Sequence, residues 1–466
     1  MLIPLTIPSP PPLFMAIHPQ PLAFPLPLWR VHEQPSAIWP SQPHPANWNL
    51  ELGYSLVLGA WTLGASQTAR SFSPNLAKSR SRALHLGWPL TILLSFFTLC
   101  PALSASAQSR ARILKVENEG LLFTDNKAGV TGVDGYFSLP MGKQTAWFFG
   151  DVFLLDPNAP VKHWLGDVSN CALLTPSGKG RRGLATYHFL TNPQTAIARP
   201  VITNRPDEGH DTRFWPLAGY YDESQRVAYL YYNLVEFTKE GGPFGFRVIG
   251  YGLAKSDARD PEKLQFERVK SSAGNDLWGR IETSPSFGLA MVSGMPGPQL
   301  YLFSDQDHKR KGVATLARVS RQHIAEQQAY EYFSGTVAAP AWSTNVNDAT
   351  NLAGLADISG SLSVAYNKYL GGYLAVHHVG IGEKMRLSIA KEPWGPYEKI
   401  GEITAPHRAF AKAFCYDSAE HPELQEENGR IIYITYVDSD RYWQQLYKVT
   451  LQTGKPGASG ANPPTK

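Results

Sequence analysis

The feature that most constrains the fold of this chain is a repeated group of short strands after its first hundred residues. From Arg112 onward, runs rich in Tyr, Phe, Val, Ile and Leu are separated by Gly, Pro, Asn and Asp, a pattern typical of an all-β protein. Each group begins with a small or polar strand near a carboxylate and continues into a strongly apolar strand. Five such groups follow one another, at residues 133–155, 214–254, 284–319, 361–390 and 418–449.

This five-fold repeat predicts a five-bladed β-propeller, in which each group forms one four-stranded blade around a central channel. The early strand 113–117 is expected to complete the last blade, so that the ring has no exposed edge. A double β-sandwich is the alternative architecture. The apolar second strands, expected to pack between neighbouring blades, are residues 229–232, 300–303, 372–376 and 431–436.

Helices are expected to be few in this all-β chain. The stretch 322–330 is the segment with a pattern that suggests a short helix. It lies between two strand groups, so we expect it to connect blades and not to form a layer of its own.

The segment before the strand groups carries a targeting pattern. Its first fifty residues hold 13 of the 37 prolines without helical or alternating periodicity, so residues 1–77 are predicted to be unstructured or not truly translated. Residues 78–107 combine basic residues, an apolar run and the small-residue site Ala105-Ser106-Ala107, as in a secretory signal peptide. The apolar run of about a dozen residues is shorter than the roughly 20 that span a bilayer.

We therefore expect a secreted or periplasmic protein that is cleaved near Ala107. The propeller domain is expected over residues 108–453, followed by a disordered tail at 454–466. No integral membrane domain is expected, and the mature protein is expected to be a monomer.

The charge balance gives no reason to expect a nucleic-acid partner. Residues 108–466 contain 38 basic and 37 acidic side chains, which is close to neutral. Cys171 and Cys415 are the cysteines that remain, and they could pair in an oxidising compartment, although two cysteines make no disulfide framework. Because phosphate-loop, His-Glu-x-x-His and Gly-x-Ser-x-Gly motifs are missing from the sequence, no cofactor and no metal are expected.

The leading candidate site is the aspartate pair Asp134 and Asp151, on the two sides of a predicted hairpin. If this hairpin turns at Gly142-Lys143, the numbers of facing residues add up to 285, which places Asp134 opposite Asp151. Like charges opposite each other destabilise a sheet, and two adjacent carboxylates have their pKa values driven apart, as glycoside hydrolysis requires. Alternatively, Asp134 only starts a turn and Asp151 only caps a strand; a one-residue shift would separate them.

Five further residues are candidates for the same channel mouth. Glu282 is a candidate general acid, or else a solvated loop residue. In the second group, Asp211 could tune neighbouring pKa values, Arg213 could bind a hydroxyl or carboxylate, and Trp215 could stack on a sugar. The alternative is an Asp211–Arg213 ion pair with Trp215 packed between blades. His421 could bind a carboxylate or a sugar hydroxyl, or could be structural.

Several short motifs, taken in their order along the chain, resemble one family. The segments that carry the resemblance are Gly132–Ser138, Trp147–Asp151, Trp215–Leu217, Trp394–Tyr397 and Ala419–Leu424. Together they resemble the domain of unknown function DUF4185, from about Asn118 to Leu451. That family is similar to the five-bladed arabinanases and levanases, and part of it is classed as glycoside hydrolase family 183, endo-acting D-arabinan hydrolases. The resemblance implies that Asp134 and Asp151 are the catalytic pair.

These observations together predict a secreted, glycoside hydrolase-like enzyme that cleaves a polysaccharide or oligosaccharide, with arabinan as one candidate substrate. Asp134 is expected to act as base or nucleophile and Asp151 as acid, or the reverse. The alternative is a non-catalytic carbohydrate-binding or surface-interaction propeller that holds its ligand by aromatic stacking.

Overall fold

The computed structural model describes residues 111–454, apart from 210, 239–244, 293–296, 307–310, 381, 383 and 406–413. The predictions for residues 1–107 and for nearly all of the tail lie outside the described residues. The described part consists of strands, turns and short 3-10 helices, and it contains no α-helix. The predicted all-β class is therefore confirmed. Within the same residues, no helix is long and apolar enough to cross a membrane.

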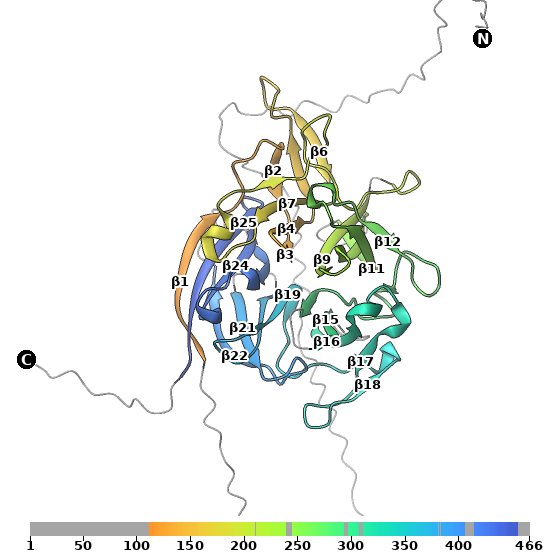
Figure 1. The fold of residues 1–466 in the computed structure, drawn as a ribbon, viewed down its shortest axis with the longest axis vertical. Coiled ribbons are helices and arrows are strands. Elements are labelled where there is room, and N and C mark those ends of the chain that lie inside the picture. The colour runs from red at the N-terminus through yellow and green to blue at the C-terminus, as the bar shows by residue number, and fades with distance from the viewer. Residues whose placement is uncertain are drawn as a thin grey trace, which may run out of the picture. The chain divides into compact units, whose positions relative to one another are not determined.

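The described strands form six antiparallel sheets (Figure 1). The first sheet contains β3 (Tyr136–Met141), β4 (Gln144–Phe149), β7 (Cys171–Pro176) and β8 (His188–Phe189). The second contains β9 (Thr212–Asp222), β10 (Val227–Phe237), β11 (Phe246–Asp257), β12 (Glu267–Val269) and β13 (Gly279–Arg280). The third contains β14 (Ala290–Val292), β15 (Gln299–Gln306), β16 (Lys311–Ser320), β17 (Glu331–Phe333) and β18 (Trp342–Ser343).

The remaining sheets include both ends of the described chain. The fourth sheet contains β19 (Ile358–Asn367), β20 (Gly372–Val379), β21 (Lys384–Ala390) and β22 (Glu398–Thr404). The fifth contains β23 (Cys415–Glu420), β24 (Ile431–Asp438), β25 (Trp443–Gln452) and β1 (Arg112–Leu121). The sixth contains β2 (Val130–Val133), β5 (Val152–Leu155) and β6 (Trp164–Val168). The 3-10 helices are Gly180–Leu184, Pro261–Lys263, Arg321–His323, Gln327–Ala329, Val346–Asp348, Pro422–Leu424 and Glu427–Gly429.

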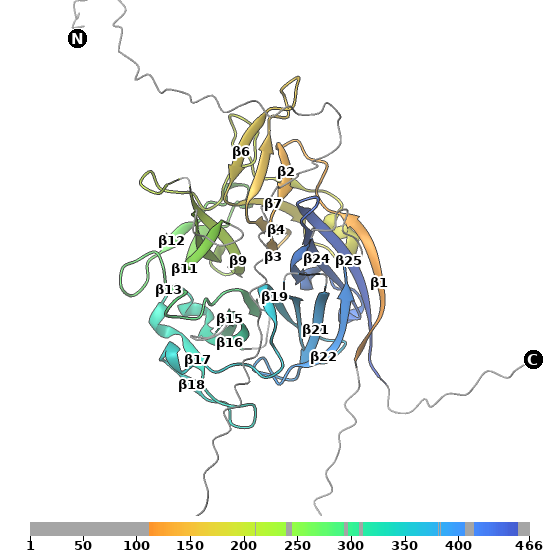
Figure 2. The same ribbon diagram turned by 180° about the vertical axis from the view of Figure 1, so that it is seen from behind.

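The first strands of the five larger sheets lie innermost. β3 contacts β9, β9 contacts β14, β14 contacts β19, β19 contacts β23, and β23 contacts β3. The sheets therefore follow one another in sequence order around a common centre, as both face-on views show (Figures 1 and 2). Polar side chains in these first strands are thereby brought toward one region from distant parts of the sequence.

The predicted apolar second strands lie in β10, β15, β20 and β24, and they are buried on both faces. Because successive side chains of a strand point to opposite sides, one strand serves two cores. In β10, Leu230 and Tyr232 pack toward the first sheet, whereas Tyr231 packs toward the third. In β24, Ile434 packs toward the fourth sheet and Tyr433 toward the first. This two-sided burial explains why these strands are continuous apolar runs.

The early strand completes the fifth sheet as predicted. β1 pairs antiparallel with β25, with Ile113 opposite Leu451. The prediction of one short helix at 322–330 is wrong, because this stretch forms two separate 3-10 turns. Its buried residues Ile324 and Tyr330 are six positions apart, which does not fit one face of an α-helix. The hydroxyl of Tyr330 donates to the carbonyl oxygen of Ile324 and holds the segment in this form.

Cys171 and Cys415 are not bonded to each other in the described structure. Cys171 packs in the core between the first and fifth sheets, and Cys415 packs in the core between the fourth and fifth. The disulfide that the sequence left open is therefore not formed.

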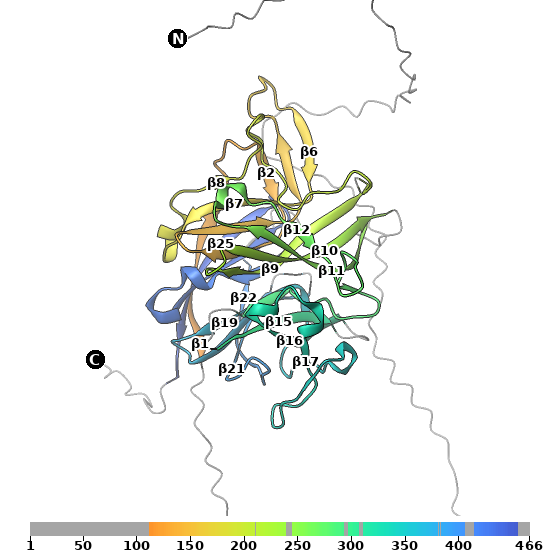
Figure 3. The same cartoon turned by 45° about the vertical axis from the view of Figure 1, so that its right-hand side comes forward.

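The first predicted strand group contributes to two sheets. β3 and β4 belong to the first sheet, whereas β2 and β5, which precede and follow them, belong to the sixth with β6. The sixth sheet extends past the other five (Figure 3). Asp134-Gly135 and Gly150-Asp151 lie where the chain crosses from one sheet to the other. The two candidate acids thus occupy a break in the strand pairing.

Replacement of Asn170 tests how the first and second sheets are joined. This fully buried amide donates to the carbonyl oxygens of Ile202 and Phe214, at 3.0 and 3.1 Å, and accepts from the backbone N–H groups of Val201 and Ile202, both at 2.9 Å. We expect Asn170→Ala to lower the free energy of unfolding by roughly 3 kcal/mol, because it leaves buried backbone groups unpaired. Chemical denaturation measures the change. The exposed Asn158→Ala is the control, expected within about 0.5 kcal/mol of wild type; equal stability of the two variants would contradict the role of Asn170.

Candidate functional site

The hairpin register brings Asp134 and Asp151 face to face. Tyr136 pairs with Phe149 and Met141 with Gln144, which is the register predicted from the sequence. The pairing continues past the strand ends: Asp134 N–H donates to the carbonyl oxygen of Asp151 at 2.9 Å, and Gly150 N–H donates to that of Gly135 at 2.8 Å. The two aspartates are therefore neighbours at the crossing between the first and sixth sheets.

The Asp134 carboxylate is held by hydrogen bonds from three directions. The backbone N–H of Gly135 donates to its Oδ1 at 2.8 Å, and the hydroxyls of Tyr416 and Tyr442 also donate to the carboxylate. Burial raises the pKa of Asp134, while these three hydrogen bonds act in the opposite direction because they stabilise the charged form. Gln444 Nε2 donates to the Asp134 carbonyl at 3.1 Å and fixes the backbone beside it.

Asp151 is in a different electrostatic state. It is buried, and burial together with the neighbouring Asp134 charge raises the pKa of Asp151 to about 7. The Arg213 guanidinium and the Trp215 indole lower this pKa, but by less. Asp151 Oδ1 lies 3.8 Å from Arg213 Nε, which is too long for a hydrogen bond. Asp151 Oδ1, Arg213 Nε and Trp215 Nε1 are all buried and have no hydrogen-bond partner in the protein.

Arg213 is fixed by the sixth sheet and not by its sequence neighbour. Its Nη2 lies 2.6 Å from Asp167 Oδ2, and its guanidinium lies over the ring of Phe237, 5.2 Å from the centroid. The alternative ion pair with Asp211 is therefore wrong. Asp211 is exposed in the turn before β9, and no contact joins its side chain to the acid pair in the described part of the chain.

A third carboxylate, Asp417, was missed from the sequence. Its side chain lies directly against Gly135, where a Cβ atom would overlap it. Burial and the nearby Asp134 charge raise the pKa of Asp417 well above its usual range. Asp417 has φ +50° and Tyr442 has φ +49°, a left-handed conformation that costs a non-glycine residue about 1–2 kcal/mol and that clusters at functional sites. The available signal was a carboxylate in the first strand of the last repeat.

Trp215 and Glu282 differ in their relation to this centre. Trp215 packs edge-on against Phe246 at 4.8 Å and is only partly buried, so its ring borders the acid pair from β9. Glu282 is exposed in the turn after β13. Among the described residues no contact connects Glu282 to Asp134 or Asp151, so the structure does not join it to the pair.

His421 is enclosed within the protein. Its ring is fully buried, with Nδ1 2.6 Å from Ser138 Oγ and Nε2 2.9 Å from Thr435 Oγ1, and it packs on Trp147 at 4.4 Å. Burial lowers the pKa of His421 to about 3, so the ring is neutral. This position fits the structural alternative for His421, because both nitrogens already have protein partners.

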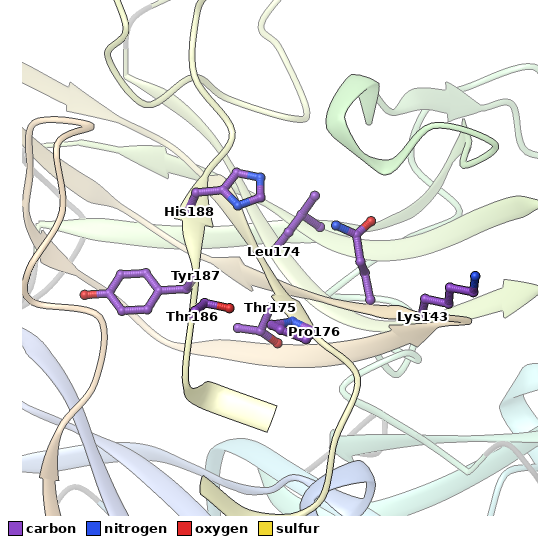
Figure 4. A pocket seen from close by; sticks show the side chains of 8 residues that line it. Lys143, Leu174, Thr175, Pro176, Thr186, Tyr187 and His188 are labelled. Atoms are coloured by element: carbon purple, nitrogen blue, oxygen red, sulfur yellow. The ribbon is translucent and has the colours of Figure 1, made fainter. Parts of the chain in front are cut away.

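Two other features bear on what the site can hold. Within the described residues, no group of three or more His, Cys, Asp or Glu side chains could hold a metal ion. A surface pocket on the first sheet (Figure 4) is lined by Lys143, Gln144, Leu174, Thr175, Pro176, Thr186, Tyr187 and His188. None of the candidate acids lines this pocket. Asp134 and Asp151 lie instead at the crossing between the first and sixth sheets, and we place the candidate site there.

One protein-family model matches most of the chain. The model of DUF4185, a domain of unknown function, matches residues 121–451. The chain belongs to the DUF4185 family. The match covers both candidate aspartates and Asp417, Tyr416 and Tyr442. No curated protein sequence matches this DUF4185 chain significantly.

Several solved structures align with this DUF4185 protein, and one of them shares its fold. It aligns with the crystal structure of a "putative hydrolase" from Bacteroides ovatus with a TM-score of 0.51 and 14% identity, over 70% of this chain and 87% of that one. An α-L-arabinofuranosidase from Podospora anserina, in complex with cellotriose, aligns with a TM-score of 0.40 and 11% identity, over 73% of this chain and 97% of that one. A family 117 glycoside hydrolase from Zobellia galactanivorans aligns with a TM-score of 0.38 and 9% identity, over 74% of this chain and 91% of that one. The fold similarity rests on the first of these.

The raised pKa of Asp151 predicts how stability depends on pH. Because the folded pKa of about 7 exceeds the ordinary aspartate pKa of 3.8, the folded state binds the extra proton, and stability falls as the pH rises through this window. Asp151→Asn removes the effect. As the pH rises from 5 to 8.5, we expect the free energy of unfolding of the variant, relative to that of wild type, to increase by roughly 2–3 kcal/mol.

Thermal unfolding of both proteins at the two pH values measures this gain. Asp211→Asn, which changes an exposed aspartate, is the matched control and should follow wild type at both pH values. A constant difference between Asp151→Asn and wild type across the range would contradict the raised pKa.

Proposed function

We propose that this DUF4185 protein is a secreted, glycoside hydrolase-like enzyme whose catalytic residues are Asp134 and Asp151. The observation that carries the proposal is the pair of opposed, enclosed carboxylates with a raised pKa at Asp151. Such a pair destabilises a fold, so its presence is best explained by a functional role. Glycoside hydrolysis is a reaction that needs one protonated and one ionised carboxyl group beside the same bond.

The surroundings of the two acids support different roles for them. Adjacent carboxyl groups compete for a proton, and the hydrogen bonds to Asp134 favour its charged form. Burial raises the pKa of both carboxyl groups, and the three hydrogen bonds oppose this rise only at Asp134, so we assign the proton to Asp151. Its Oδ1 has no protein partner and can donate to the glycosidic oxygen. Asp134 acts as the base or nucleophile, and Tyr416 and Tyr442 orient its oxygens.

Arg213 and Trp215 are proposed to bind the substrate at this centre. Arg213 Nε and Trp215 Nε1 are buried donors without protein acceptors, and both lie beside Asp151 Oδ1. A sugar hydroxyl oxygen can accept hydrogen bonds from these two donors. Because Asp167 holds the far side of the guanidinium, Arg213 offers Nε in a fixed orientation.

The finer parts of the proposal rest on the sequence. Arabinan is proposed as the substrate class because part of the family that the motifs resemble is classed as D-arabinan hydrolases. Secretion rests on the signal-peptide pattern at residues 78–107, and a monomer remains our expectation. Five sheets with mutually contacting first strands support a five-bladed propeller with the site near its centre.

A non-catalytic sugar-binding propeller would use some of the same residues. Arg213 and Trp215 could hold a glycan without cleaving it. Binding alone, however, gains nothing from a carboxyl group whose pKa is raised to about 7 by burial and by a second carboxyl group opposite it. We therefore favour the enzyme.

Removal of either acid is expected to abolish hydrolysis. Asp134→Asn and Asp151→Asn should each lower kcat on the responsive polysaccharide by about 100- to 10,000-fold, the usual contribution of a positioned acid or base. Reducing-end release from a panel of arabinan, xylan, levan and β-glucan measures this. Equal product release by wild type and both variants would show that the site is misassigned.

Glu282→Gln separates a two-acid site from one that includes the third predicted acid. Because Glu282 is exposed and no described contact joins it to the pair, we expect this variant to keep most of the wild-type activity in the same assay. A loss of a hundred-fold or more would bring Glu282 into the catalytic site.

The pKa of Asp151 also predicts the pH profile of hydrolysis. If Asp151 donates the proton, kcat/KM should fall about tenfold per pH unit above a pKa near 7, because the acid form is lost. Initial rates over the range pH 5 to 9 measure this limb. A profile that stays flat up to pH 9 would exclude Asp151 as the general acid.

A further inference from the structure

A row of three aromatic rings leads away from the acid pair. The ring of Tyr442 stacks on that of Phe153, with centroids 4.5 Å apart and planes 18° apart. Phe153 in turn lies 5.5 Å from Trp164, at 58°. Trp164 is 45% exposed, although a tryptophan is usually well buried. Part of the Trp164 ring is therefore open to solvent.

The backbone beneath the rings is shaped to hold them. A Cβ atom on Gly132 would lie 3.0 Å from Tyr442 Cδ1 and 3.2 Å from Phe153 Cδ2, so this glycine lets both rings approach the strand. β5 and β6 pair with Leu155 opposite Trp164 and Phe153 opposite Asp167. Trp164 is thus carried on a paired strand and not on a loose loop.

The β5–β6 hairpin and Tyr442 each contact the proposed catalytic centre. The Tyr442 hydroxyl hydrogen-bonds to the Asp134 carboxylate, so the inner end of the row touches the proposed base. Asp167, on the same strand as Trp164, forms the 2.6 Å ion pair with Arg213. The sixth sheet, which carries the row, extends past the other sheets (Figure 3). A series of contacts therefore connects Asp134 through Tyr442 and Phe153 to Trp164.

We propose that Trp164 and Phe153, continued by Tyr442, form a subsite that binds a further sugar ring of the polysaccharide chain. The inference rests on the proposed function for its ligand class, because a glycan held at Asp134 has to continue over a neighbouring surface. Sugar rings have apolar C–H faces, and exposed aromatic rings offer matching apolar area with little loss of conformational entropy. The subsite binds chains that extend beyond the cleaved bond and contributes nothing to the shortest substrates.

The test measures binding and hydrolysis separately. In an Asp151→Asn background, which should not hydrolyse its ligand, native affinity gels containing soluble arabinan, xylan or β-glucan report binding. We expect Trp164→Ala to weaken binding of the retained polysaccharide about tenfold. In the active protein, the same change should raise KM for that polysaccharide about tenfold and leave kcat on a short chromogenic glycoside unchanged.

Two variants control for folding and for general effects on the hairpin. Trp164→Phe keeps an aromatic face and should restore most of the binding. Val161→Ala changes a 76% exposed apolar residue between β5 and β6 and should bind like the parent. Equal melting temperatures of the three variants show that the hairpin is intact.

The outcomes distinguish this inference from the proposed chemistry. If the polysaccharide retards migration in a way that depends on Trp164 but wild type does not hydrolyse it, the subsite is supported and the proposed enzymatic activity is contradicted. Parent-like binding by Trp164→Ala overturns the subsite, whatever the activity. Failure to bind any of the polysaccharides also overturns it, as does a dimer that is seen by light scattering and lost in Trp164→Ala, because the surface would then serve a second copy of the chain.

Discussion

The structure of the site depends on the crossing at which two backbone hydrogen bonds join Asp134 to Asp151 and Gly150 to Gly135. These bonds keep two acidic side chains opposite each other although their charges repel. Burial and mutual repulsion then raise the pKa of Asp151, and the tyrosine hydroxyls favour the charged form of Asp134. Two chemically identical side chains thus have different electrostatic environments because of where the chain leaves one sheet for another.

The sequence was informative where a structural rule acts locally. A tight turn at Gly142-Lys143 fixes the hairpin register, so the position of Asp151 opposite Asp134 could be predicted by counting residues. The second strands were predictable because burial on both faces requires continuous apolar runs. The early strand could be assigned to the last sheet because an unpaired edge is unfavourable. Each of these predictions follows from one element and its immediate neighbours.

The parts that were missed depend on contacts between distant segments. Asp417, Tyr416 and Tyr442 reach Asp134 from the fifth sheet, and no sequence spacing encodes that approach. Arg213 is paired with Asp167 in another sheet, and not with the nearby Asp211. The exposed positions of Asp211 and Glu282 likewise follow from turn geometry that residue type does not reveal. The sequence was thus sufficient to predict the two central acids, whereas their partners are determined by tertiary packing.

The pairing of β1 with β25 has a consequence for when the site can exist. This pairing joins residues up to 340 positions apart, as between Arg112 and Gln452, and contacts of such long range form late and slowly. Tyr442 and Asp417 belong to the same fifth sheet and reach Asp134 only when that sheet docks against the first. A nascent chain released before its last strands would contain both aspartates but not the environment that distinguishes them. Chemical competence is thereby linked to the completion of synthesis.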